Sequence, residues 1–245
     1  MVCLSIGLHY TSFVAKTGCR LNNKDYMVYN IDMIITYLGR EAVKIQYGDL
    51  VIAFNPPTKT SSLKINKFGA DIALETLPHE DMCGGEEMVY GDKKPFVISG
   101  PGEYEVNSIF IKGLAGESSY DIDKDDKKLI NTIYALTVEG INILYLGAQD
   151  GPLPKDTSDA IDSVDVLFLP IGGKGVLEPK EAYKLAMNIE PKVIIPIHFD
   201  GKKDSALEAF LKEAGDHGEP VDKLTIKKKD LDGKNGDIIV LLPQQ

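Results

Sequence analysis

The chain has 245 residues, of which 43% are hydrophobic and 26% charged, a balance typical of a globular protein with a core large enough for one domain. Its formal net charge of -10 argues against a nucleic-acid backbone or an anionic membrane as the main partner. Its apolar runs stay below the roughly 18 residues of a membrane span, and its three cysteines are unpatterned, so we expect reduced thiols in the cytoplasm.

The N-terminal stretch 1–32 differs from the rest of the chain. Its apolar residues are scattered without a period, and no basic region precedes them, so a secretory signal is not expected. A regular strand pattern starts at Met33, and we therefore place the folded domain at residues 33–245. Residues 1–32 are either an extension or sequence upstream of the natural start, and both interpretations stay open.

The first half of the domain is rich in predicted strands. Segments 42–47 and 50–54 flank Gly48-Asp49, which is typical of a hairpin turn. Further strands are expected at 71–76, 95–99, 103–106, 108–113, 129–139 and 141–146. The polar and acidic stretch 117–128 is expected to be a surface loop.

The second half alternates strands with helices. Segments 164–170 and 192–197 are nearly all apolar, as in strands covered on both faces. Helices are predicted at 178–189, from an apolar stripe at helical spacing, and at 204–214. The last two strands, 224–228 and 237–242, are predicted to form a closing hairpin whose lysines 227–229 face solvent. Many strands with few helices indicate two sheets face to face, with the helices packed outside.

A short loop after the strand at 71–76 concentrates side chains that bind metals or protons. It carries His79, Glu80, Asp81 and Cys83. Imidazole and carboxylate groups in a loop at the end of a strand are a common way to build a metal or acid–base site. Taken alone, however, the stretch is better explained as a polar loop with solvated side chains, because one histidine and one aspartate two residues apart are a weak signal.

Several segments of the chain resemble the metallo-β-lactamase superfamily, in particular its small bacterial branch of Zn-dependent hydrolase-like proteins. They are Ile-Thr-Tyr-Leu-Gly at 35–39, the loop at 77–82, Gly-Pro-Gly-Glu-Tyr-Glu at 100–105, Leu-Pro-Ile-Gly-Gly at 169–173 and Pro-Lys-Val-Ile-Ile-Pro-Ile-His at 191–198. The resemblance covers residues 33–245 and implies a single α/β domain, the four-layer αββα sandwich. In active members, one or two metal ions at the sheet edge activate a water that attacks an ester, amide or phosphodiester.

The resemblance also implies that the metal site is degenerate. The family motif His-x-His-x-Asp-His falls on Leu77, His79, Asp81 and Met82, so two ligand positions are apolar. The candidate metal ligands that remain are His79, Asp81 and His198.

Three other family positions depart from the pattern. The bridging aspartate is Ala148, and the region of the middle histidine, 114–120, contains no histidine. Asn55 replaces an aspartate that usually fixes the first loop; its amide can still accept a hydrogen bond. The other histidines, His9 and His217, are expected to be ordinary surface residues.

Three arrangements of the remaining polar side chains stay open. They form a hydrogen-bonded knot that braces the loops, or hold a single weakly bound zinc or manganese ion with help from Cys83. The third arrangement is a different small-ligand pocket that uses Glu103, Glu105 or Asp150. Because metal affinity needs several donors acting together, we expect no tightly bound cofactor and well under one equivalent of transition metal.

Two functions follow from these arrangements. The first hypothesis is a non-hydrolytic, degenerate member that binds a small molecule or a protein, or acts as a scaffold. The alternative is a metal-dependent hydrolase that uses one weakly held ion at His79, Asp81 and His198. In either case His198 is expected within hydrogen-bonding reach of Asp81 or His79. The sequence assigns no catalytic residue and no substrate, and it leaves a homo-oligomer open.

Overall fold

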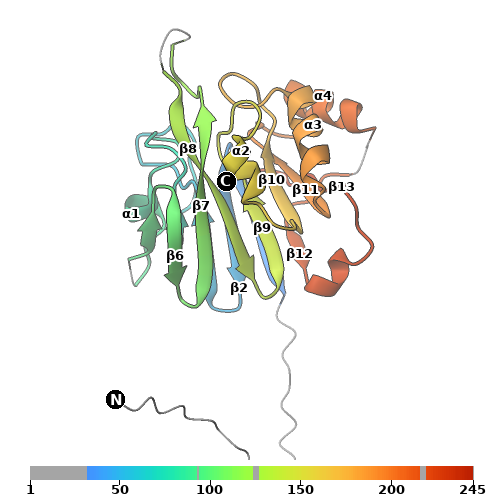
Figure 1. The fold of residues 1–245 in the computed structure, drawn as a ribbon. Coiled ribbons are helices and arrows are strands. Elements are labelled where there is room, and N and C mark those ends of the chain that lie inside the picture. The colour runs from blue at the N-terminus through green and yellow to red at the C-terminus, as the bar shows by residue number, and fades with distance from the viewer. Residues whose placement is uncertain (1–31, 93, 124–126, 216–218, 245) are drawn as a thin grey trace, which may run out of the picture. The chain divides into compact units, whose positions relative to one another are not determined.

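The computed structural model describes residues 32–244 except 93, 124–126 and 216–218. The predictions for His9, for His217 and for the stretch 1–31 therefore lie outside the described residues. Two sheets stand face to face, with helices beside them (Figure 1). Across the described part of the chain, no helix is long and apolar enough to cross a membrane.

The first sheet has six strands in the order β12-β1-β2-β3-β4-β5. Their bounds are Met33–Gly39 (β1), Ala42–Tyr47 (β2), Leu50–Phe54 (β3), Ile72–Leu74 (β4), Phe96–Ile98 (β5) and Leu224–Ile226 (β12). β12, β1, β2 and β3 pair antiparallel, whereas β3, β4 and β5 pair parallel. The parallel part sends the ends of β3, β4 and β5 to one edge of the sheet.

Side chains of the first sheet alternate between two buried faces, as the pleat of a strand requires. Ile72 and Leu74 of β4 belong to the core between the sheets, whereas Ala73 between them faces outward. The outer face is covered by Leu63 and by the helix α1, Gly85–Met88. An irregular segment and a four-residue helix thus form the outer layer here, which is thinner than the four-layer description implies.

The second sheet has seven strands in the order β13-β11-β10-β9-β8-β7-β6. Their bounds are Gly102–Val106 (β6), Ile109–Ser118 (β7), Leu129–Val138 (β8), Ile141–Tyr145 (β9), Val166–Pro170 (β10), Val193–Ile197 (β11) and Asp237–Ile238 (β13). β10 and β11 are buried along their whole length, as predicted for strands covered on both faces. The helices on this side are α2 (Lys155–Asp159), α3 (Pro179–Ile189) and α4 (Ser205–Ala214).

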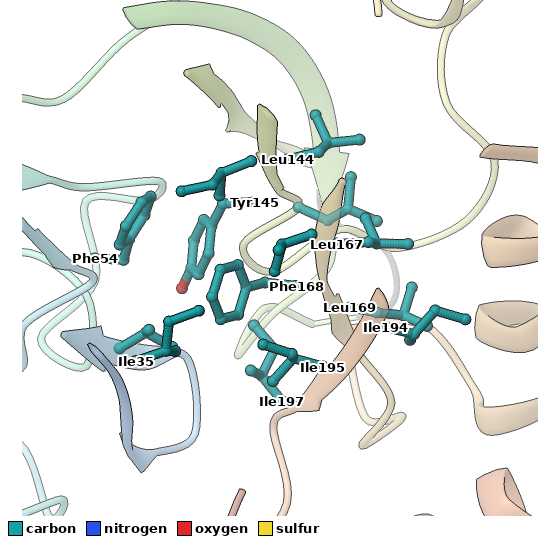
Figure 2. Close-up of a cluster of buried hydrophobic side chains, with 14 of the residues drawn as sticks. Ile35, Phe54, Leu144, Tyr145, Leu167, Phe168, Leu169, Ile194, Ile195 and Ile197 are labelled. Atoms are coloured by element: carbon teal, nitrogen blue, oxygen red, sulfur yellow. The ribbon is translucent and has the colours of Figure 1, made fainter. Parts of the chain in front are cut away.

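Aromatic side chains fill the space between the sheets (Figure 2). Phe54 of the first sheet packs on Tyr145 and Phe168 of the second, with ring centroids 4.5 and 6.1 Å apart. Tyr134 of β8 crosses the core, and its hydroxyl lies 2.8 Å from the carbonyl oxygen of Glu75 and 2.9 Å from that of Ile98. Because a buried tyrosine hydroxyl needs a partner, this contact fixes the ends of β4 and β5 to the second sheet.

Two predictions about the elements were wrong. The last two strands do not form a hairpin, because β12 pairs with β1 in the first sheet and β13 with β11 in the second. The 3-10 helix Lys228–Leu231 separates them, and its Lys228 pairs with buried Asp165 instead of facing only solvent. The loop expected at 117–128 also starts later, because β7 continues to Ser118, which pairs with Leu129.

Candidate functional site

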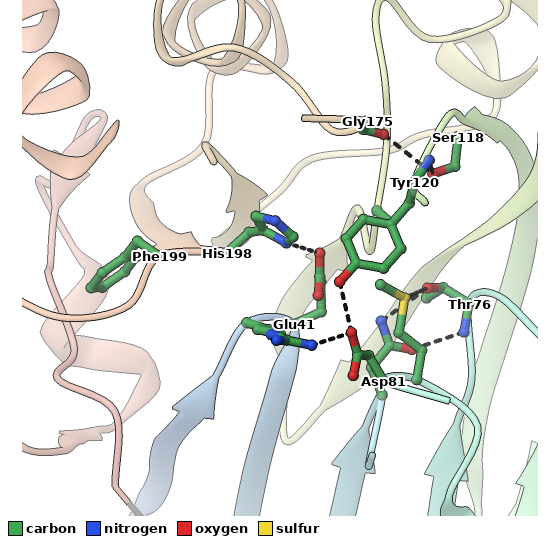
Figure 3. A network of polar contacts seen from close by, with 12 residues as sticks. Glu41, Thr76, Asp81, Ser118, Tyr120, Gly175, His198 and Phe199 are labelled. Carbon is green, nitrogen blue, oxygen red and sulfur yellow. Dashed lines mark hydrogen bonds and ion pairs between the residues drawn. The ribbon is translucent and has the colours of Figure 1, made fainter. Parts of the chain in front are cut away.

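The candidate residues gather at the edge where several strands end. The loop with His79 and Asp81 follows β4, and His198 follows β11 directly. Glu41, in the turn between β1 and β2, and Tyr120, just after β7, lie at the same place (Figure 3). Arg40, beside Glu41 in that turn, pairs with Asp81. Residues far apart in the sequence therefore build one polar network.

Asn55 fixes the start of the loop that carries His79 and Asp81. Its backbone adopts a positive φ of 43°, and its side-chain oxygen accepts a hydrogen bond from the Thr76 N–H at 2.8 Å. Its side-chain nitrogen donates to the Thr76 hydroxyl at 2.9 Å. The expectation that this amide accepts a hydrogen bond is confirmed, and the amide donates one as well.

Asp81 is held entirely by protein donors. Its side chain is 4% exposed and pairs with the Arg40 guanidinium and the Ser61 hydroxyl. The Tyr120 hydroxyl donates to it at 2.7 Å. Burial alone would raise the pKa of this carboxyl, but the hydrogen bonds of Ser61 and Tyr120 and the charge of Arg40 outweigh burial and lower the pKa. Asp81 is thus an ionised carboxylate whose charge is already compensated.

His79 uses both of its ring nitrogens. Nδ1 accepts a hydrogen bond from the Asp81 backbone N–H at 3.1 Å, so the donor nitrogen of the ring is Nε2. Nε2 lies 3.1 Å from the Asp121 carboxylate. To bind a metal ion, the His79 ring would therefore have to break one of these two contacts.

His198 stands at the end of β11 with a positive φ of 61°. Its backbone N–H donates to the Arg40 carbonyl at 2.6 Å, and its ring Nδ1 contacts Glu41, whose side chain is fully buried. Burial alone would lower the pKa of His198, but the charge and hydrogen bond of Glu41 outweigh it, so the pKa is raised.

Tyr120 separates His198 from His79 and Asp81. Its ring meets that of His79 edge-on at a centroid distance of 5.0 Å and that of His198 at 5.4 Å. Among the described residues, His198 makes no hydrogen bond with Asp81 or His79; its carboxylate partner is Glu41. The predicted direct contact is therefore replaced by two separate pairs, Asp81 with Arg40 and His198 with Glu41.

Three positions at which the resemblance implies metal ligands in active members form an apolar cluster. Leu77, Met82 and Ala148 are buried and pack together with Val176. Zinc needs several nitrogen, sulfur or oxygen donors around one centre. In the described part of the chain, no group of three or more His, Cys, Asp or Glu side chains is arranged to hold a metal ion. The residues present do not fit a metal centre, and the ligand role of His79, Asp81 and His198 stays a prediction.

Two cavities adjoin the network. The smaller, of about 240 Å³, is lined by Arg40, Tyr120, Lys174 and His198, among others. The larger, of about 810 Å³, is lined by acidic side chains that include Asp150, as the small-ligand alternative proposed.

The other residues considered for the site lie elsewhere. Glu103 and Glu105 are exposed on β6 and line neither of these cavities. Cys83 is a half-buried free thiol that belongs to no metal-binding group among the described residues. Burial, together with nearby Glu75, raises the pKa of that thiol, which makes the metal-binding thiolate harder to form.

Four residues of the network were not predicted from the sequence: Arg40, Glu41, Ser61 and Tyr120. A charged pair in a tight turn is usually solvated, so nothing in the residues 39–42 indicates that Glu41 is buried. For Tyr120 the sequence offers one signal, because this residue lies in the segment 114–120, where the resemblance implies a metal ligand.

The model of the β-lactamase superfamily domain matches residues 34–198 of this sequence. The chain belongs to the β-lactamase superfamily. Among its relatives, a UPF0173 metal-dependent hydrolase of Thermococcus onnurineus is 30% identical, over 76% of this chain and 94% of the relative. The metal-dependent hydrolase YtkL of Bacillus subtilis is 25% identical, over 69% of this chain and 86% of the relative.

Solved structures of the superfamily share the fold. A Thermotoga maritima protein assigned as a Zn-dependent hydrolase is 28% identical and superposes with a TM-score of 0.66, covering 85% of this chain and 98% of the other. The metallo hydrolase Igni18 of Ignicoccus hospitalis, 19% identical with a TM-score of 0.56 over 87% of this chain and 97% of the other, supports the fold alone. Relatives of this superfamily member are thus named metal-dependent hydrolases, which is closer to the alternative hypothesis than to the scaffold.

Proposed function

We propose that this superfamily member binds a small polar molecule in the cleft beside Arg40, Lys174 and His198 without a metal ion. The observation that carries the proposal is the charge compensation of Asp81. Its carboxylate is compensated by Arg40, Ser61 and Tyr120, so a cation would have to displace a guanidinium that is already hydrogen-bonded in place.

The apolar cluster supports the same proposal. Leu77, Met82 and Ala148 fill the ligand positions with carbon and sulfur atoms that face one another. A metal ion with its bound water would lie against this surface without the donors that offset its lost hydration. The cavity of about 240 Å³ beside the cluster is lined instead by donors and charges that suit a small polar ligand.

The metal content of the full chain, purified without chelator, tests the proposal. Elemental analysis should find well under one equivalent of zinc, manganese or iron per chain. Calorimetric titration with Zn²⁺ or Mn²⁺ should show no stoichiometric binding tighter than about 10 µM, because a site with one or two free donors lacks chelation. One equivalent of metal that Asp81→Asn or His198→Gln removes would refute the proposal.

A second function, metal-dependent hydrolysis with one weakly held ion at His79, Asp81 and His198, is favoured by the relatives, which are named metal-dependent or Zn-dependent hydrolases. It requires Tyr120 and Arg40 to move away from Asp81. Ester or phosphodiester hydrolysis that appears with added Zn²⁺ or Mn²⁺, and that disappears with EDTA, would select this function over the first.

A further inference from the structure

A buried carboxylate–imidazole pair forms one wall of the smaller cavity. The side chain of Glu41 is 0% exposed and contacts His198 Nδ1. Its other oxygen, Oε2, has no hydrogen-bond partner among the described residues. Keeping a carboxylate in such a place is costly, so a reason other than packing is required. Figure 3 shows the pair beside Tyr120 and Asp81, with no contact drawn between the two carboxylates.

The pair is held in place from both sides. The Tyr145 hydroxyl donates to the Glu41 carbonyl, and the His198 N–H donates to the Arg40 carbonyl at 2.6 Å. Gly172 faces the imidazole so closely that an added Cβ would lie 2.1 Å from His198 Cδ2. The chain thus provides a glycine where the ring has to fit, and the ring orientation is fixed.

Strained backbone gathers at the same cavity. Arg40, Lys174 and His198 all line it, and their φ angles are 49°, 53° and 61°. Positive φ is uncommon for residues other than glycine, and such strain persists only where the surroundings impose it. Three such residues around one small cavity favour a function for the cavity.

We propose that His198, oriented by Glu41, is a metal-independent general base that hydrolyses small carboxylic esters in this cavity. The inference rests on the metal-free cleft proposed above, because a metal on His198 would occupy the nitrogen that acts as base. Nδ1–H donates to Glu41, which leaves the lone pair on Nε2 at the opposite side of the ring. His198 is the catalytic residue and Glu41 a positioning residue.

Two cations line the cavity together with the carboxylates of Asp200 and Asp204, and the cations can stabilise negative charge on the substrate. Arg40 is one of them, and its guanidinium also holds Asp81. Lys174 is the other, and its ammonium forms no ion pair or hydrogen bond within the described ranges. Fixed positive charge near a developing oxyanion is a major source of rate acceleration in ester hydrolysis.

The reaction balances with water as the only co-reactant. His198 Nε2 takes a proton from water while the water oxygen forms a bond to the ester carbonyl carbon, and the π electrons move to the carbonyl oxygen. The oxyanion beside Lys174 and Arg40 then collapses, the bond from carbon to the alkoxy oxygen breaks, and the leaving oxygen takes the proton from Nε2. The products are a carboxylic acid and an alcohol, and His198 is neutral again.

Hydrolysis of p-nitrophenyl acetate by the full chain, after EDTA treatment and dialysis, tests the proposal. His198→Gly should lower kcat/KM by about 10²-fold, the lower end of general-base contributions. Glycine tolerates the positive φ of residue 198 and leaves a space for imidazole. Added imidazole should therefore raise the rate of His198→Gly at least about tenfold, because it replaces the missing general base. His217→Gln, the matched control for background reaction of histidines, should keep the full rate.

Two further measurements separate positioning from folding. Glu41→Gln keeps the side-chain shape and should lower kcat while KM stays unchanged. Nitrogen NMR of His198 should show the Nδ1–H tautomer in the wild type and a changed tautomer ratio in Glu41→Gln. If circular dichroism shows that His198→Gly does not fold, these two results test the general-base role of His198 in its place.

Three outcomes would overturn the inference: equal rates in the wild type and His198→Gly, equal rates and tautomer ratios in the wild type and Glu41→Gln, or loss of the rate on EDTA treatment. The first two leave the metal-free cleft standing, because metal content is measured independently. Loss of the rate with EDTA, together with bound metal, would remove both proposals.

Discussion

At Asp81, the charge partner is a guanidinium that belongs to the chain itself. Arginine stays charged at every pH at which the protein is folded, and its planar fork matches a carboxylate. The Arg40 side chain is 29% exposed and Asp81 is 4% exposed, so the pair lies at the border of the interior. In this position, removal of the cation leaves a carboxylate that water reaches poorly.

Arg40→Met should therefore destabilise the fold by about 2 kcal/mol, less than the 3–5 kcal/mol of a fully buried pair because Arg40 is partly exposed. Urea unfolding at pH 7 measures the change. The matched control is Lys202→Met, which breaks the exposed pair with Glu219 and should change stability by less than about 1 kcal/mol. Equal effects of the two substitutions would show that the Asp81 pair is no stronger than a surface pair.

The sequence predicts part of this site and not the rest, for physical reasons. His79 and Asp81 are neighbours in one loop after a predicted strand, and His198 ends an apolar strand, so the pattern predicts that each lies at a strand end, and the family resemblance predicts that they share one site. Glu41 cannot be read in this way, because its burial depends on Tyr145 and His198 from the other sheet. Polar contacts between segments more than 100 residues apart leave no local signal.

At the level of elements, the connection after β10 depends on one glycine. An added Cβ at Gly172 would lie 2.1 Å from the His198 ring and 2.4 Å from its carbonyl oxygen. Gly172→Ala should therefore destabilise the protein by about 2 kcal/mol, the usual cost of overpacking. Thermal denaturation measures it against Gly100→Ala, where an added Cβ meets nothing within 4 Å. A Gly172→Ala variant as stable as the control would mean that the His198 loop moves freely.

Asp165 joins three elements and predicts a pH dependence. Its carboxylate accepts from the Asn142 N–H at 2.8 Å and pairs with Lys228 at 2.5 Å and Lys192 at 2.9 Å. Burial alone would raise its pKa, but these contacts outweigh burial and lower it.

A depressed folded-state pKa contributes stability above the unfolded pKa of about 3.9, and this contribution is lost as pH falls through the folded value. Asp165→Asn should thus be less stable than the wild type at pH 7, and the difference should shrink below about pH 4, where both states of the wild type take up the proton. Urea unfolding from pH 7 to pH 2.5 measures it. A difference that stays constant over this range would exclude the ionised carboxylate as its source.

Most strands follow from the local pattern, and the exceptions show its limit. β2 and β3 lie at the predicted segments 42–47 and 50–54, because the Gly48-Asp49 turn between them is a local signal. The helix α3 follows from its apolar stripe, and both α3 and α4 end where predicted. The pairing of β12 and β13 was predicted wrongly, because adjacency in sequence favours a hairpin, whereas each strand completes the edge of a different sheet.

For the whole molecule, the fold of the superfamily is kept: the chain superposes on the Thermotoga maritima structure with a TM-score of 0.66 over 85% of its length. The apolar cluster of Leu77, Met82, Ala148 and Val176 is a small buried cluster of its own, against which Tyr120 and Leu129 pack. Replacing its members by metal-binding residues should lower the stability of the fold and raise its affinity for metal ions.

The combined variant Leu77→His, Met82→His and Ala148→Asp, with Arg40→Ala to free Asp81, tests that exchange. Without metal it should be several kcal/mol less stable than the wild type, because three polar groups enter a buried apolar cluster. With Zn²⁺ at 100 times its dissociation constant, the variant should regain about 2.7 kcal/mol, since a ligand that binds only the folded state stabilises it by mass action. Thermal denaturation with and without Zn²⁺ measures both effects, and the wild type, treated in parallel, should show no shift.

An equal Zn²⁺ shift in the wild type would mean that the present residues already bind the ion. No shift in the folded variant would mean that the backbone no longer places these side chains around one centre.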